Sequence, residues 1–124
     1  MSYKPIIIVA GEPFSIFVEI FFKALKKNKF KNPIILIVSK NLMIKQMRDL
    51  KISHKFFLID KDNFDYPKLS NVKPNVIDVD FAFEQPFEKI TKKSNKYISK
   101  CFSIASRLIK KNKCAGLING PISK

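Results

Sequence analysis

Five short apolar runs alternate with longer stretches of mixed polarity along this chain. Each run is too short for a helix and suits a strand of a parallel sheet that is covered on both faces. One run, 76–80, alternates apolar and acidic residues and predicts a half-exposed edge strand instead. The predicted strands cover 5–10, 34–38, 56–59, 76–80 and 114–118.

Between these runs, apolar residues recur at the spacing of amphipathic helices. This spacing predicts helices over 15–27, 41–50 and 94–112, with Ser15 and Ser39 placed to cap the first two. A strand, a helix and a second strand in this order imply a right-handed crossover, and hence a parallel pair of strands. The positions predicted to form the apolar face of the first helix are Ile16, Phe17, Ile20, Phe21, Ala24 and Leu25.

The whole pattern predicts one α/β domain over 1–124, with a mostly parallel sheet and helices on both faces. Residues 60–74 lose the periodicity and gather Asp, Asn, Pro and Lys, which is typical of a loop. His54 is the only histidine, so a surface position or the start of a strand suits it better than metal ligation. Cys101 and Cys114 stand within apolar runs and are predicted to be reduced core residues.

The composition is strongly basic, with 24 Lys and Arg residues against 10 Asp and Glu and a formal net charge of +14. This charge raises the hypothesis of a lysine-rich nucleic-acid-binding protein, because basic side chains displace counterions from phosphates. Two observations weigh against it. Only Arg48 and Arg107 are arginine, which phosphate and base recognition favour, and the lysines are spread over nearly every segment.

The apolar runs also bear on location. None reaches the length of a membrane span, and the run at 5–10 is too short for the core of a signal peptide. We therefore expect a cytoplasmic protein that does not insert into a membrane.

Two predicted strands end in a glycine-containing loop that carries a charged residue. The first strand leads into Gly11-Glu12-Pro13, and the last leads through Asn119 into Gly120-Pro121-Ile122-Ser123-Lys124. Parallel strands end on a common edge of the sheet, and in open α/β sheets ligands bind at that edge. We therefore expect Glu12 and Lys124 to lie near one another, in one crevice between neighbouring strands.

These two loops, in this order, resemble motifs of the 4-hydroxythreonine-4-phosphate dehydrogenases of vitamin B6 biosynthesis. That family opens with a strand and a Gly-Asp/Glu-Pro-Ala-Gly-Ile-Gly-Pro-Glu loop, and later carries a strand followed by Gly-Pro-x-x-Lys. The residues that match the two motifs are Gly11, Glu12, Pro13, Ile16, Glu19, Gly120, Pro121 and Lys124. The residues that depart from them are Phe14, Ser15, Phe17 and Val18, where the family has Ala, Gly, Gly and Pro.

The resemblance implies the N-terminal part of the isocitrate and isopropylmalate dehydrogenase-like fold, within a homodimer. It further implies a dehydrogenase that uses NAD and a divalent metal to oxidise and decarboxylate a phosphorylated hydroxy-amino acid, 4-phosphooxy-threonine. The family's Gly-His-Thr motif and metal-binding histidines come later in its sequence, so this chain is interpreted as an N-terminal fragment. On this interpretation the chain alone is inactive, contains no catalytic or metal-binding residue of the family, and binds neither cofactor tightly.

Only loop residues can then be carried over from the family, and the candidates for substrate binding are Glu12, Asn119, Gly120 and Lys124. The resemblance also suggests that the region before the last helix is a variable segment, here a β-excursion that includes Phe81 to Phe83. A competing hypothesis is a small Rossmann-like or flavodoxin-like binding module. The first loop lacks the Gly-x-Gly-x-x-Gly and Walker patterns that cradle phosphates, which weakens that alternative.

Overall fold

The computed structural model describes residues 4–27, 31–85, 87, 92–111 and 114–120 of the chain. It contains a five-stranded sheet in the order β3-β4-β2-β1-β5, in which every neighbouring pair is parallel. This confirms the predicted α/β class with a parallel sheet. The strands are β1 (Ile6–Val9), β2 (Ile34–Val38), β3 (Phe57–Leu58), β4 (Asn75–Asp78) and β5 (Gly116–Asn119).

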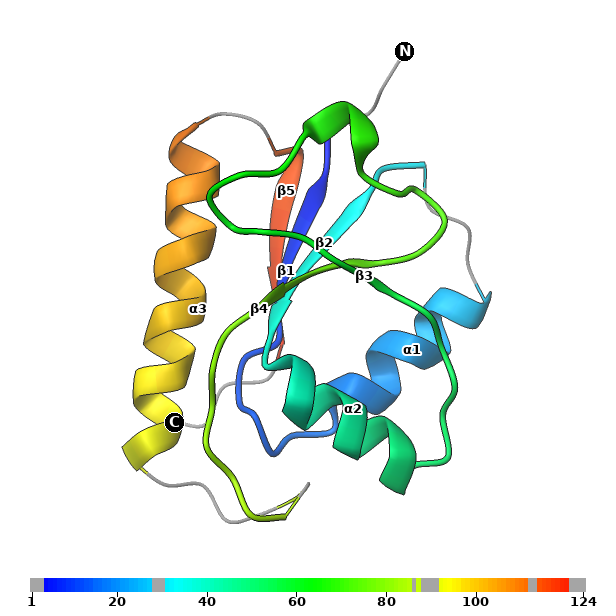
Figure 1. Ribbon diagram of the computed structural model, residues 1–124, viewed down its shortest axis with the longest axis vertical. Helices are drawn as coiled ribbons and strands as arrows, with labels where there is room; N and C mark the ends of the chain where they lie inside the picture. The colour runs from blue at the N-terminus through cyan, green and yellow to red at the C-terminus, as the bar shows by residue number, and fades with distance from the viewer. Residues whose placement is uncertain (1–3, 28–30, 86, 88–91, 112–113, 121–124) are drawn as a thin grey trace.

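Helices cover both faces of the sheet (Figure 1). They are α1 (Phe17–Lys27), α2 (Lys40–Asp49) and α3 (Lys92–Lys110), and a 3-10 turn, η1 (Tyr66–Lys68), precedes β4. The helices α1 and α2 pack on one face, and α3 packs on the other. No helix among the described residues is long and apolar enough to span a bilayer.

Alternate residues of the central strands belong to two hydrophobic cores, one on each face of the sheet, because successive side chains of a strand point to opposite faces. Under α3, Ile35 and Ile37 of β2 pack with Cys101, Ala105 and other residues of that helix. On the other face, the alternate β2 residues Ile34, Leu36 and Val38 pack beneath α1 and α2. Much of the apolar face of α3 therefore packs into one core with the sheet, whereas Ile109 is 39% exposed.

Side chains accept hydrogen bonds from backbone N–H groups at the N-terminus of α2. The Ser39 Oγ accepts a hydrogen bond from the Leu42 N–H at 3.3 Å, so the predicted cap is confirmed. Asp78 Oδ1, at the end of β4, accepts from the Lys40 N–H at 2.8 Å. The Tyr97 hydroxyl of α3 accepts from the Ser39 N–H at 2.6 Å. The last two contacts tie β4 and α3 to the loop that leaves β2.

The edge-strand prediction for 76–80 is wrong. The strand β4 lies between β3 and β2, and Val76 and Ile77 are buried. The acidic residues stand at and beyond its carboxyl end, where Asp78 accepts the hydrogen bond from α2. The alternation therefore reflects this capping contact and the start of a loop rather than exposure of one sheet face.

The prediction that 114–118 is covered on both faces is also wrong. The strand β5 forms an edge of the sheet, and Leu117 and Ile118 are 40% and 55% exposed. Within the described chain β5 pairs with β1 alone, and α3 packs on β1 and β2 rather than over the edge. The sequence of β5 is typical of a buried strand, but among the described residues β5 has a neighbouring strand on only one side.

Two further predictions need correction. Phe21 is buried as expected, but Ile16, just before α1, and Ile20 are 61% and 53% exposed, and Val18 and Phe22 are buried in their place. The charged residues of α1 lie on one side and its apolar residues cover a wide arc, so the sequence is compatible with more than one buried face, and packing on the sheet and α2 selects one. Residues 81–83, expected as a β-excursion, form no strand.

Candidate functional site

The two glycine-containing loops begin side by side at the carboxyl edge of the sheet. β1 and β5 are direct neighbours, and Val9 lies opposite Asn119 in their register. The Gly120 N–H donates a hydrogen bond of 2.7 Å to the Val9 carbonyl oxygen. The prediction that Gly11 and Gly120 lie at one edge, after neighbouring parallel strands, is confirmed.

Gly120 is buried where the two loops meet, and the space allows no side chain. A Cβ at this position would collide with the Ala10 carbonyl oxygen and would lie 2.7 Å from Cδ1 of the Phe17 ring. Phe17 therefore occupies the space beside Gly120 that the smaller family residue would leave open. Phe14, the other bulky departure from the motif, packs against Phe81 with ring centroids 5.5 Å apart.

The first loop has a fixed shape. Gly11 has a φ of 78°, in the left-handed region that glycine adopts without strain. The Ser15 N–H then donates to the Glu12 carbonyl oxygen at 3.2 Å, which closes a tight turn. The Gln46 side chain of α2 donates to the Pro13 carbonyl oxygen at 2.8 Å. The loop is thus held both by its own turn and by a buried amide from a different element.

Glu12 places a carboxyl group inside the protein at this edge, with only 5% of its surface exposed. Burial raises the pKa of this carboxyl above its ordinary value of 4.5, because desolvation disfavours the charged form, and the nearby Ser94 hydroxyl of α3 opposes part of that rise. Among the described residues, Glu12 Oε1 and Ser94 Oγ nevertheless lack a hydrogen-bond partner of ordinary geometry. A buried acid with an unpaired oxygen beside an unpaired hydroxyl is a candidate functional group.

A cavity of about 10 Å³ lies beside Glu12, lined also by Gln46 and Tyr97. This space is about enough for one water molecule. Tyr97 is buried, and desolvation raises the pKa of its hydroxyl well above the ordinary value, so the hydroxyl stays neutral. Burial likewise raises the pKa of the neighbouring Cys101 thiol to about 12. Of these three groups, Glu12 is the carboxyl, and its pKa is raised from a much lower ordinary value than those of Tyr97 and Cys101.

The second loop presents Asn119 at the exposed end of β5. Its side-chain amide donates to the Gly120 carbonyl oxygen at 3.2 Å, which orients the amide along the loop. Lys124, the remaining predicted site residue, lies outside the described residues, so its predicted position near Glu12 stays a prediction. The structure brings the segments of Glu12, Asn119 and Gly120 to one edge.

The sequence reasoning did not single out Ser94 and Gln46 as site residues. Both are buried beside the first loop, although they come from different helices. Gln46 carried a usable signal, because it is a polar residue within the inward side of its helix. Ser94 carried none, since a serine at the start of a helix is ordinary.

The described residues do not fit a metal centre. No group of three or more His, Cys, Asp or Glu side chains among them lies close enough to hold a metal ion. His54 is half-buried just before β3, with its ring packed on Phe22 at a centroid distance of 5.2 Å. Its position agrees with the structural role expected from the sequence.

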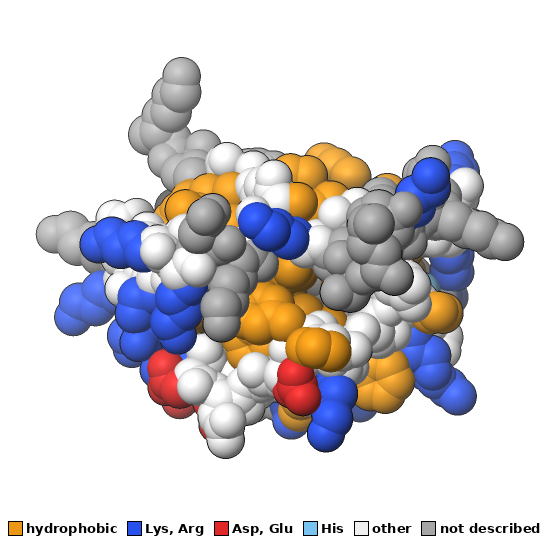
Figure 2. Space-filling model, turned by 90° about the horizontal axis from the view of Figure 1, so that it is seen from above, with side chains coloured by type: hydrophobic (Ala, Val, Ile, Leu, Met, Phe, Trp, Pro, Cys, Tyr) orange, Lys and Arg blue, Asp and Glu red, His pale blue; other side chains and the backbone are white. Residues whose placement is uncertain are grey.

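The face of the molecule shown in Figure 2 offers no argument for a nucleic-acid interface. Lysine and arginine side chains are scattered over the face shown in Figure 2, with hydrophobic side chains between them, rather than gathered in one stripe. A backbone-binding groove requires such a stripe. The scattered pattern agrees with lysines that fill exposed positions.

A parallel α/β domain with two loops converging at the carboxyl edge belongs to the class of folds that take a ligand at that edge. Two solved structures share this fold over essentially the whole chain. A 4-hydroxythreonine-4-phosphate dehydrogenase from Burkholderia phymatum matches with a TM-score of 0.76 and 15% identity, over 100% of this chain and 38% of its own. A proposed 4-hydroxythreonine-4-phosphate dehydrogenase from Salmonella typhimurium matches with a TM-score of 0.78 and 20% identity, over 99% of this chain and 38% of its own.

At these identities the likeness establishes the fold, which agrees with the fold that the loop motifs imply. The chain spans 38% of the length of each of these structures. No protein-family model matches the chain, and no curated protein matches it by sequence.

Proposed function

We propose that this chain is the N-terminal part of a 4-hydroxythreonine-4-phosphate dehydrogenase, an enzyme that oxidises 4-phosphooxy-threonine and releases carbon dioxide. The observation that carries the proposal is the meeting of the Gly11–Pro13 loop with Asn119 and Gly120 at one sheet edge. Both loops carry residues of the family motifs, and the fold that joins them is that of two structures bearing this enzyme's name.

In this proposal the edge binds and orients the substrate. Asn119 offers an amide to the charged ends of an amino-acid phosphate, and Gly120 lets the end of β5 approach Ala10 closely, which brings the two loops together. Glu12, buried and partly unpaired, can accept a hydrogen bond from a hydroxyl or ammonium group of the substrate. Lys124 would supply a positive charge to bind an anionic end of the amino-acid phosphate.

In this proposal the described residues do not by themselves form the binding sites for NAD and a divalent metal. They include no metal-ligand cluster, and the first loop has no phosphate-cradling glycine pattern. When bound, NAD accepts the hydride, and the metal stabilises the charge that develops during decarboxylation. We propose that residues outside this chain hold both groups. The expected cytoplasmic location and homodimer belong to the same proposal.

The proposal is tested on the gene and its product. We expect the reading frame to continue beyond the Lys124 codon with Gly-His-Thr and further histidines. The complete product should form NADH from 4-phosphooxy-threonine, and only with a divalent metal. Glu12→Gln should lower kcat/KM for this substrate, whereas Asp62→Asn, at an exposed ion pair with Arg107 outside both loops, serves as the matched control and should not. A complete product that is inactive with NAD and metal would contradict the proposal.

A further inference from the structure

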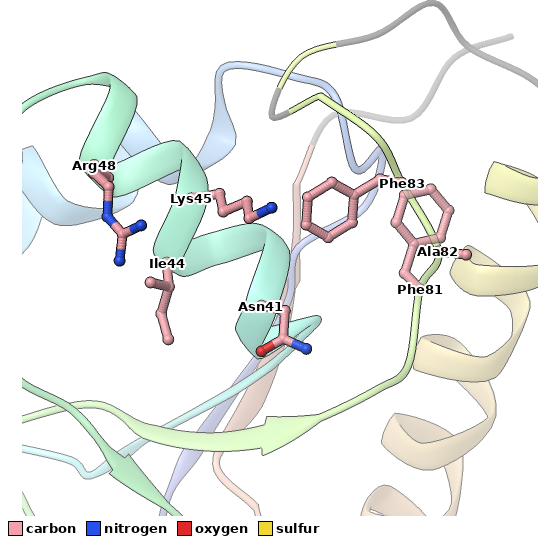
Figure 3. A pocket seen from close by; sticks show the side chains of 7 residues that line it. All are labelled: Asn41, Ile44, Lys45, Arg48, Phe81, Ala82 and Phe83. Atoms are coloured by element: carbon pink, nitrogen blue, oxygen red, sulfur yellow. The ribbon is translucent and has the colours of Figure 1, made fainter.

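A second concave site lies away from the Glu12 loop, between α2 and the segment that follows β4. It is a groove of about 490 Å³, within the range of small-molecule sites. Asn41, Ile44, Lys45 and Arg48 form one stripe along α2, and residues 81–83 form the opposite wall. Figure 3 shows the side chains of Lys45 and Phe83 pointing toward one another across the groove.

The topology explains why a crevice opens here. The strands β2 and β4 are neighbours, yet β2 leads to α2 on one face of the sheet, whereas β4 leads to α3 on the other. The chain therefore diverges at the carboxyl ends of two adjacent parallel strands. Such switch points are the common ligand sites of open α/β sheets.

The groove combines positive charge with aromatic surface. Lys45 Nζ lies 5.4 Å from the Phe83 ring centroid. The rings of Phe81 and Phe83 are nearly parallel, with an interplanar angle of 15° and centroids 6.3 Å apart. Among the described residues, neither Lys45 nor Arg48 forms an ion pair. Both cations are thus available to a ligand beside half-buried rings.

The positive charge of the groove comes from the side chains of Lys45 and Arg48, and the groups around them do not add to it. The backbone N–H groups of Lys40 and Leu42 are already engaged by Asp78 and Ser39, so the first turn of α2 offers them to no anion. Asp49 follows Arg48 at the far end of the helix. Glu84 follows Phe83 and has an interaction of its own.

We propose that this groove binds a small aromatic anion of the class of a nucleoside monophosphate. The phosphate would lie against Lys45 and Arg48, and the ring would pack against Phe83. Guanidinium and ammonium groups favour phosphate, and an aromatic wall stacks a base. The groove shares no lining residue with the proposed substrate edge, although Phe81 of the groove packs against Phe14 of the first loop.

The test is a calorimetric and NMR titration of the chain with adenosine 5′-monophosphate. We expect saturable binding, with shift changes at the amides of Asn41 to Arg48 and at residues 81–83. Lys45→Gln with Arg48→Gln should raise Kd by about tenfold or more, as expected for the loss of charged hydrogen bonds. Phe83→Leu should also weaken binding. Lys26→Gln with Lys27→Gln is the matched control, since it removes two exposed charges from the end of α1 and should leave Kd within about twofold.

Several results would overturn the proposal. One is equal affinity for inorganic phosphate, which would mean that the aromatic wall contributes nothing. Another is equal weakening in the Lys26 and Lys27 control, which would mean attraction to the net charge of +14 alone. A third is the absence of shift changes at α2 and residues 81–83 of the wild-type chain. This measurement does not depend on whether any variant folds.

Discussion

Position 120 lies directly against the carbonyl oxygen of Ala10, so the ends of β5 and β1 approach more closely than any side chain would allow. This contact positions the two loops of the candidate site relative to each other. The same contact makes glycine at 120 a structural requirement, independently of any ligand.

The Gly120→Ala substitution should therefore destabilise the fold by about 1–3 kcal/mol, the usual cost of forcing an extra methyl group into a packed site. Gly116→Ala, at the start of the same strand, is the control, because a Cβ there meets nothing within 4 Å. Urea denaturation followed by circular dichroism measures both. Equal stability of the two variants would show that the Ala10 contact is looser than described.

Glu12→Gln should stabilise the protein at neutral pH. The folded pKa of Glu12 is raised, so the folded state holds its proton more tightly than the unfolded state. Stability of the wild type is therefore lost as pH rises from the unfolded value through the folded one. The gain in melting temperature should be clear at pH 7 and absent at a pH below the ordinary value of 4.5. Glu19→Gln, at the exposed pair with Lys23, should show no such gain.

The exposed edge of the sheet predicts self-association. Ile118 of β5 is 55% exposed, and Ile16, just before α1, and Ile20 of α1 are 61% and 53% exposed. An unpaired strand edge with apolar neighbours is a template for pairing with another chain. Ile118→Lys should reduce the concentration-dependent mass seen in sedimentation. Val72→Lys removes an apolar residue that is 82% exposed in a loop, and it should leave the mass unchanged. A monodisperse wild-type monomer at high concentration would contradict this prediction.

The 124-residue chain by itself should be catalytically inert. The described residues contain no metal-ligand cluster, and the chain spans 38% of the length of the solved structures that share its fold. A spectrophotometric assay with 4-phosphooxy-threonine, NAD and a divalent metal should show no NADH. Metal-dependent NADH formation by this chain would prove the prediction wrong.

The sequence was sufficient to predict the order and parallel direction of the elements, because short apolar runs and amphipathic stretches alternate clearly. It misplaced β4 and misjudged the exposure of β5, since a strand's position in the sheet depends on partners distant in sequence. The buried face of α1 was ambiguous for a different reason. Its apolar residues cover an arc wider than the face that is buried, and tertiary packing selects the buried part.

The candidate site was predictable only in part. The glycine-containing loops predicted that Glu12 and Gly120 lie at the same edge of the sheet. Loops that follow parallel strands meet at the carboxyl edge even when they are far apart in sequence. The partners of the Glu12 loop, Ser94 and Gln46, come from helices whose placement the local pattern does not define. The same limit applies to the groove on α2. It joins Lys45 to Phe83, residues that only the β2–β4 pairing brings together.

The central claim is that the first loop and the end of β5 form one substrate-binding edge. The most direct test is an NMR titration of the isotope-labelled chain with 4-phosphooxy-threonine at millimolar concentration, since binding to this chain alone is expected to be weak. The account predicts shift changes at the amides of Gly11, Glu12, Asn119 and Gly120, and none at the exposed loop residue Val72. Shift changes spread over the lysine-rich surface, with none at these four amides, would contradict it.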